Sequence, residues 1–203
     1  MKNLIGSKIE VYSLNELPKA PEDLKYFACI GGNKNYECFL ESRSLSRAQF
    51  MKKYENEVDI CHKPIYEDEN LIIRQDAQYP LPGFYIIATK TGKRTIADID
   101  TNLYQKGMEY AFLIKTILQE SFKIKKVYIY YDEHYHKPSS VHFWVMPIYE
   151  DVLNENNLKA TIFSNDIWKY LDLFEFKDTK EEIYKINEEM KKIINKGVNE
   201  YER

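Results

Sequence analysis

The chain has 203 residues, of which 44% are hydrophobic and 14% aromatic, with only 7 Gly and 7 Pro. This composition can form a sizeable core and excludes a disordered or fibrous chain. A net charge of -3 gives no overall attraction to duplex nucleic acid or to an anionic membrane, so any phosphate binding must be local.

The N-terminal region, residues 1–60, contains a predicted strand at residues 26–30, a turn at 31–35 and a helix beginning near Ser46. We expect an extension packed on the core. Residues 1–8 lack the apolar run of a signal peptide, and no segment is long enough to span a bilayer. These features predict a cytoplasmic protein without membrane contact.

Three cysteines, Cys29, Cys38 and Cys61, cannot form a fully paired framework, and they lack C-x-x-C spacing. Together with His62 they amount to four potential zinc ligands, but buried or free thiols are the favoured interpretation. We therefore expect no metal and no cofactor, and the cysteine usage also favours the cytoplasm.

The middle region, residues 61–150, contains four predicted strands, near residues 71–75, 84–89, 127–131 and 141–146. A long helix begins near residues 100–102, whose side chains offer capping oxygens, and runs to about Phe122. Several of its side chains recur at roughly helical spacing and predict a packing helix: Leu103, Met108, Ala111, Phe112, Lys115 and Leu118.

The last region, residues 151–203, ends in a charged helix. Thr179 and Glu182 have the spacing of a capping box. An apolar stripe follows, typical of a core or dimer contact, formed by Ile183, Ile186, Met190, Ile193 and Ile194.

The segment 140–147 places a histidine inside an apolar, aromatic, β-prone run. Alternation along a strand puts Phe143 on one face with Val141 and Val145, and His142 on the other with Trp144. A lone strand histidine is more often a hydrogen-bonded structural residue than a catalyst, so its context must decide.

That context is a series of segments in the middle region that resembles the HIT (histidine triad) superfamily in order and spacing. The series comprises residues 64–73, Asp76, residues 80–83, 85–90, 96–100, the following helix, residues 124–129 and residues 141–147. The resemblance implies an α+β fold, a HIT-like antiparallel sheet with a long packing helix, here with N- and C-terminal extensions. It also implies a homodimer.

In HIT enzymes the middle histidine of an H-x-H-x-H strand attacks the α-phosphorus of a nucleotide. His142 takes that place, and a neutral imidazole is abundant at cytoplasmic pH. Ser140 and Trp144 stand where the flanking histidines would be. Tryptophan can donate one hydrogen bond but cannot transfer a proton, so Trp144 is a large departure at a catalytic position.

Asp76 occupies the place where HIT relatives bind the nucleotide ribose, a role that suits a short carboxylate accepting bonds from vicinal hydroxyls. A turn residue at the end of a strand is an equally good interpretation of the residues alone. A histidine often found after the Pro-Gly pair is here Phe84.

The loop before the His142 strand stands where HIT relatives contact phosphate. Lys137 offers a positive charge, Ser139 and Ser140 offer hydrogen bonds, and His136 is a candidate to replace the missing proton donor. A solvated loop ranks slightly behind phosphate contact, and metal chelation by the two loop histidines ranks third.

Two functions follow from the resemblance. The first is a nucleotidyl hydrolase or transferase, acting at the α-phosphate of a nucleotide or nucleotide conjugate through His142. The second is an inactive nucleotide-binding or protein-interaction module, which the loss of two triad histidines favours. Loss of turnover in a His142→Ala variant would separate them.

Overall fold

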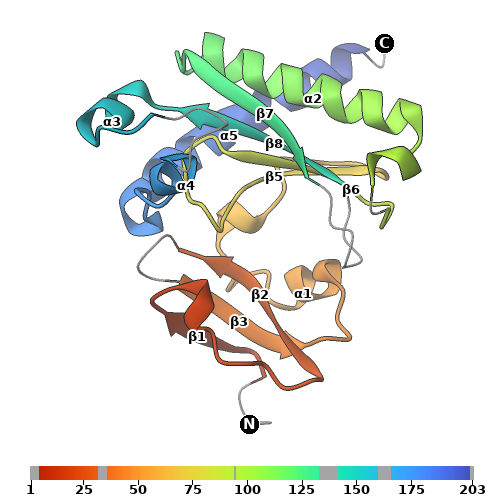
Figure 1. The fold of residues 1–203 in the computed structure, drawn as a ribbon. Coiled ribbons are helices and arrows are strands. Elements are labelled where there is room, and N and C mark those ends of the chain that lie inside the picture. Colours follow the sequence, from red (N-terminus) through yellow and green to blue (C-terminus); the bar gives the residue numbers. More distant parts are fainter. Residues whose placement is uncertain (1–4, 32–35, 94, 133–140, 160–165, 202–203) are drawn as a thin grey trace.

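A computed structural model describes residues 5–31, 36–93, 95–132, 141–159 and 166–201, excluding the side chains of residue 132 and residues 197–201. The chain forms two antiparallel sheets with helices around them (Figure 1). The predicted α+β class is therefore confirmed. None of the helices in the described part has the length and apolarity needed to cross a membrane.

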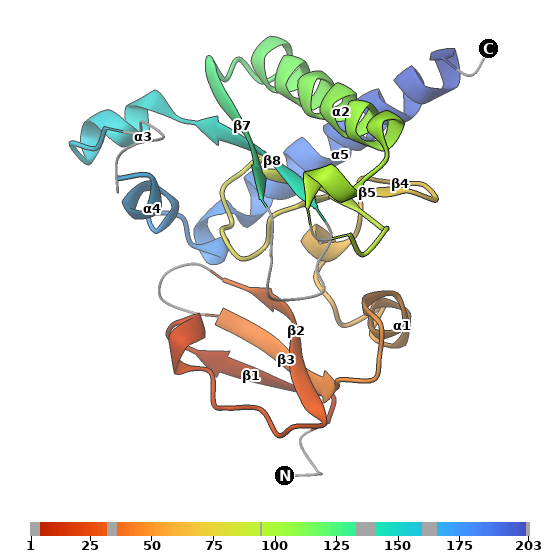
Figure 2. The same ribbon diagram turned by 45° about the vertical axis from the view of Figure 1, so that its right-hand side comes forward.

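The N-terminal unit is a three-stranded antiparallel sheet with a short helix against it (Figure 2). Its elements are β1 (Ser7–Val11), β2 (Leu24–Ile30), β3 (Tyr36–Ser42) and α1 (Arg47–Lys53), with sheet order β1-β3-β2. Ser46 caps α1 in a complete capping box with Gln49, which confirms the predicted helix start. Stacked aromatic rings, Phe27 on Phe50 with centroids 4.4 Å apart, join the helix to the sheet.

The second sheet has five antiparallel strands in the order β4-β5-β6-β8-β7. The strands are β4 (Tyr66–Glu67), β5 (Leu71–Gln75), β6 (Tyr85–Thr89), β7 (Lys126–Asp132) and β8 (His142–Ile148). The 3₁₀ helix η3 (Ile60–His62) precedes them, and two further 3₁₀ helices are η2 (Leu14–Glu16) and η4 (Ile96–Asp98). All four predicted middle-region strands are present within two residues of their predicted ends.

Two long helices pack on one face of the five-stranded sheet (Figures 1 and 2). They are α2 (Thr101–Glu120), capped by the Asp100 carboxylate, and α5 (Phe176–Tyr201). The predicted packing role of α2 is confirmed, although Phe112, one of the expected stripe, is 57% exposed. The α5 stripe enters the same core, where Ile186, Met190 and Ile194 are buried. The stripe is thus a core contact.

The predicted capping box of the last helix is wrong. Helix α5 begins at Phe176, so Thr179 already lies in its first turn. The Thr179 hydroxyl donates to the Pro80 carbonyl at 2.7 Å and also contacts the Glu175 carbonyl. It ties the helix to the loop before β6 instead of capping it.

Two short helices, α3 (Glu150–Glu155) and α4 (Asp166–Leu171), cover one end of the opposite sheet face. Met146 and Ile148 of β8 pack there against Leu153 and Tyr170. The Tyr170 hydroxyl accepts from the Tyr149 amide at 2.9 Å. The C-terminal region therefore closes part of the sheet face that carries His142.

Cys29 and Cys38 form a disulfide between β2 and β3, so the expectation of thiols was wrong for these two residues. Ala28 has a positive φ of 45° at a register shift in β2, which places Cys29 opposite Cys38. Cys61 is a buried free thiol, as expected.

Opening this disulfide should destabilise the N-terminal unit. Because the bond joins residues separated by 9 positions, the loss of loop constraint predicts a decrease of about 2–3 kcal/mol in unfolding free energy. Denaturant unfolding with and without reductant measures this decrease in unfolding free energy. Reductant should leave a Cys29→Ser variant unchanged; an equal effect on both proteins would contradict the assignment.

Glu41 is a buried carboxylate in the same unit, where it binds Lys53 at 2.6 Å, the Tyr54 hydroxyl, and the Ser42 amide at 2.7 Å. Burial alone raises its pKa, but the hydrogen bonds from Lys53, Ser42 and Tyr54 together lower the pKa below the ordinary value.

The lowered pKa fixes how the contribution of Glu41 to stability depends on pH. The Glu41 contribution should be complete above its unfolded pKa of about 4.3 and lost as pH falls through the lower folded pKa. A Glu41→Gln variant should therefore lose about 1–3 kcal/mol at neutral pH, with a smaller difference in acid. Unfolding curves across pH test this, and a difference that grows in acid would refute it.

Candidate functional site

His142 and Trp144 lie on the face of the five-stranded sheet that points away from α2. Phe143 and Val145, between and after them, enter the core beneath the helix, as the alternation predicted. The register pairs His142 with Ala88, and Trp144 with both Ile86 and Tyr130. The site residues of β8 are thus flanked by Ala88 and Ile86 of β6 and, on the other side, by the aromatic Tyr130 of β7.

The His142 imidazole is half-buried at the start of β8, with its ring centroid 5.6 Å from that of Trp144. The Trp144 indole meets Phe84 edge-on at 6.0 Å. Phe84, which replaces the expected histidine, is fully buried. An aromatic wall therefore stands beside the candidate nucleophile.

Two buried donors on this face have no partner within the described part of the chain, the Trp144 Nε1 and the Tyr130 hydroxyl. Their residues pair directly across β7 and β8. A buried donor without an acceptor costs about 1–3 kcal/mol. A ligand oxygen that accepts from these two donors would remove this cost, so the pair favours binding of an acceptor.

Asp76 follows β5 and is 4% exposed. Its Oδ1 accepts from the amides of Gln78 at 2.8 Å and Tyr79 at 3.0 Å, so the turn role left open by the sequence is present. Burial raises the pKa of this carboxyl, and the hydrogen bond from the Tyr79 amide and the positive charge of Arg74 act in the opposite direction.

Asp76 also lines a cavity of about 380 Å³ between the N-terminal unit and the five-stranded sheet. Arg47 of α1, Arg74 of β5 and His62 of η3 line it too. His142 and Trp144 are not among its lining residues. Sequence reasoning missed both arginines; the available signal was Arg74, a charged residue within the apolar run of β5.

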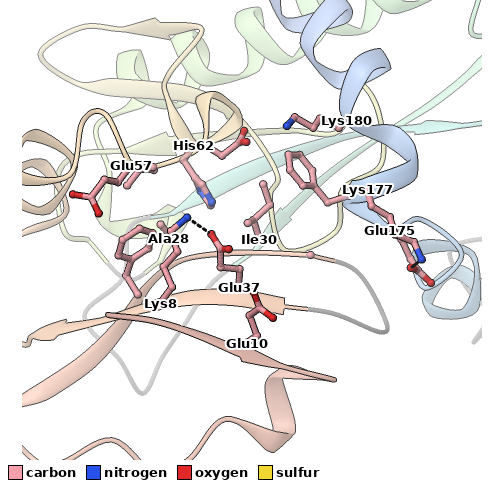
Figure 3. A pocket seen from close by; sticks show the side chains of 15 residues that line it. Lys8, Glu10, Ala28, Ile30, Glu37, Glu57, His62, Glu175, Lys177 and Lys180 are labelled. Carbon is pink, nitrogen blue, oxygen red and sulfur yellow. Dashed lines mark ion pairs between the residues drawn. The ribbon is translucent and has the colours of Figure 1, made fainter. Parts of the chain in front are cut away.

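A larger cavity, of about 530 Å³, lies between the N-terminal sheet, η3 and the start of α5 (Figure 3). His62 points into it, beside Ala28, and Lys8 forms an ion pair with Glu37 at 2.8 Å. Its lining mixes both charge signs, including Glu175 and Lys180, so it selects neither anions nor cations.

The loop candidates His136, Lys137, Ser139 and Ser140 lie outside the described residues. Their predicted roles stay predictions. Among the described residues, no group of three or more His, Cys, Asp or Glu side chains has an arrangement that could hold a metal ion.

Comparison with known proteins gives no matching family model and no matching curated protein. Solved structures do match. A HIT-like protein involved in cell-cycle regulation from Bartonella henselae is 20% identical, with 68% of this chain and 92% of that chain covered and a TM-score of 0.43.

Two other solved structures are similar at 16% identity and a TM-score of 0.41. A zinc-bound histidine triad family protein from Mycobacterium smegmatis covers 61% of this chain and 89% of its own. A HIT family protein from Bacillus anthracis covers 59% and 83%. These neighbours belong to the superfamily that the sequence resembles, and identities of this size concern the fold alone.

Proposed function

We propose that this protein binds a nucleotide or nucleotide conjugate on the His142 face and transfers or hydrolyses its nucleotidyl group. The observation that carries the proposal is the position of His142, half-buried beside Trp144 on the sheet face opposite α2. The resemblance of the middle-region segments to the HIT superfamily supports it. The identity of the substrate and the homodimeric state remain predictions.

The proposed reaction has two steps. A ring nitrogen of His142 attacks the α-phosphorus, a P–N bond forms, and the bond between phosphorus and the leaving-group oxygen or nitrogen breaks. The leaving group takes a proton, for which His136 is the predicted donor. Water or another acceptor then attacks the same phosphorus, breaks the P–N bond and releases the nucleotide.

Other residues have binding roles in this proposal. The Trp144 indole N–H, buried and unpartnered among the described residues, would donate to a phosphate oxygen. Since the Asp76 Oδ1 is used by the turn, its Oδ2 would accept from a ribose hydroxyl. Lys137, Ser139 and Ser140 remain the predicted phosphate contacts.

The second candidate is a nucleotide-binding module without turnover. The packing of Trp144 against Phe84 favours it, because this aromatic wall fills the place of a proton-transferring triad residue. In that case His142 would contact the ligand without forming a bond to it.

The experiment is to incubate the protein with dinucleoside polyphosphates, nucleoside phosphoramidates and nucleotide sugars, and to measure both calorimetric binding and released mononucleotide. Release supports the enzyme, and binding without release supports the module. Absence of both, for every compound, would reject both proposals.

A further inference from the structure

The cavity next to Asp76 is formed jointly by the N-terminal unit and the five-stranded sheet. One wall comes from β2 and α1 and includes Lys25 and Arg47, and the other comes from β5 and includes Arg74. At about 380 Å³ it is within the size range of small-ligand sites. Its cationic side chains therefore belong to two different parts of the fold.

The two guanidinium groups are close enough to affect each other. Arg47 remains accessible to solvent on α1. Desolvation by the neighbouring protein, and then the charge of Arg74, lower the pKa of Arg47 to about 10. In the described chain no carboxylate forms an ion pair with either arginine. Among the described residues, these two neighbouring cations therefore lack a compensating anion within ion-pair distance.

Asp76 is the carboxylate among the described residues that line the cavity. Burial lowers the pKa of Arg74, and the charge of Asp76 opposes this shift. One Asp76 oxygen, however, is already bound to the amides of the turn. Lys25, half-buried with its Nζ 4.5 Å from the Phe27 ring centre, adds a third positive group. With Asp76 ionised, the positive groups still outnumber the negative one.

His62 lies in the wall that the two cavities share. It is 3% exposed, and its Nε2 has no hydrogen-bond partner among the described residues. Burial and then the charges of Arg47 and Arg74 lower its pKa to about 3, so the ring is neutral. The wall of the site therefore holds a buried polar atom without a partner among the described residues, beside two cations, and a ligand that pairs with it would remove that cost.

We infer that this cavity binds the phosphate monoester group of a ligand, held between Arg47 of the N-terminal unit and Arg74 of the sheet. Guanidinium groups donate in a fork that matches phosphate oxygens. Cations on opposite walls suit a tetrahedral oxyanion better than a planar carboxylate. The inference does not depend on reaction at His142.

The test is calorimetric titration of inorganic phosphate into the wild type and the Arg47→Gln, Arg74→Gln and Lys52→Gln variants. Lys52→Gln is the matched control, because Lys52 is an exposed cation of α1 and does not line the cavity. We expect each arginine variant to weaken binding about tenfold or more, since a hydrogen bond to a charged group is lost. The control should bind like the wild type.

Phosphate should also raise the melting temperature of the wild type and the control, because a ligand that binds only the folded state stabilises it. Arg47 is exposed, so its replacement should leave a folded protein in which this shift is reduced. Equal binding by all four proteins, or no binding by the wild type at millimolar phosphate, would overturn the inference.

The phosphate can come from a free metabolite or from a nucleotide, and a comparison of adenosine 3′,5′-bisphosphate with AMP distinguishes these sources. If the wild type binds the bisphosphate more tightly than AMP, and this difference disappears in Arg47→Gln, the ligand is a nucleotide with a second phosphate. Equal affinity, with arginine-dependent binding of inorganic phosphate retained, supports a separate phosphate ligand. This result is independent of turnover, which His142→Ala tests.

Discussion

Replacing His142 by alanine should reduce turnover of the nucleotide substrate by about 10⁴-fold or more, because the variant cannot form the covalent intermediate. The fold should be retained, since His142 is half-buried and lies on the face opposite the main core. Nucleotide binding should change much less than turnover. Product release under saturating substrate measures the effect.

The matched control is Tyr131→Phe. Tyr131 lies on β7, pairs with Phe143 and is 57% exposed, so the change preserves the ring and removes a surface hydroxyl. Its turnover should equal that of the wild type. A His142→Ala enzyme that retains full turnover would mean that another group attacks the phosphorus.

The largest expected effect on stability comes from Phe143→Ala, which should cost about 3–5 kcal/mol of unfolding free energy. Phe143 is 1% exposed and packs below α2. A Cβ on Gly107 would lie only 2.6 Å from the Phe143 ring, so this glycine permits the close approach of helix and strand. Truncation of the ring would leave a cavity at that contact.

Phe112→Ala provides the control for this prediction. The same residue type lies on α2 but is 57% exposed, so its truncation should change the free energy of unfolding by about 0.5 kcal/mol or less. Chemical denaturation of both variants measures the difference. Equal destabilisation would show that α2 does not face β8 as described.

Periodicity along the chain predicted much of the core. The β8 alternation correctly separated Phe143 from His142, and the α5 stripe correctly identified a buried face. For α2, the spacing of apolar residues included the exposed Phe112, because a helical period alone does not fix which side meets the sheet. The start of α5 was predicted too late, since Thr179 binds a carbonyl of a distant loop.

The parts that sequence reasoning did not predict depend on contacts between distant elements. The Cys29–Cys38 disulfide follows from the register shift in β2, which cysteine counting does not reveal. The cavity that joins Arg47 and Arg74 follows from the packing of the N-terminal unit on the sheet. Alternation along β5 places Arg74 on a face, but only the tertiary structure supplies its neighbours.

Intact-protein mass spectrometry of the wild type and His142→Ala, after brief incubation with the nucleotide conjugates, tests the role of His142 as nucleophile. We expect a wild-type adduct with the mass of one nucleotidyl group, which is absent from the variant. An adduct on both proteins would contradict the assignment of His142. Release of product without any adduct, even after rapid acid quenching, would contradict the covalent mechanism.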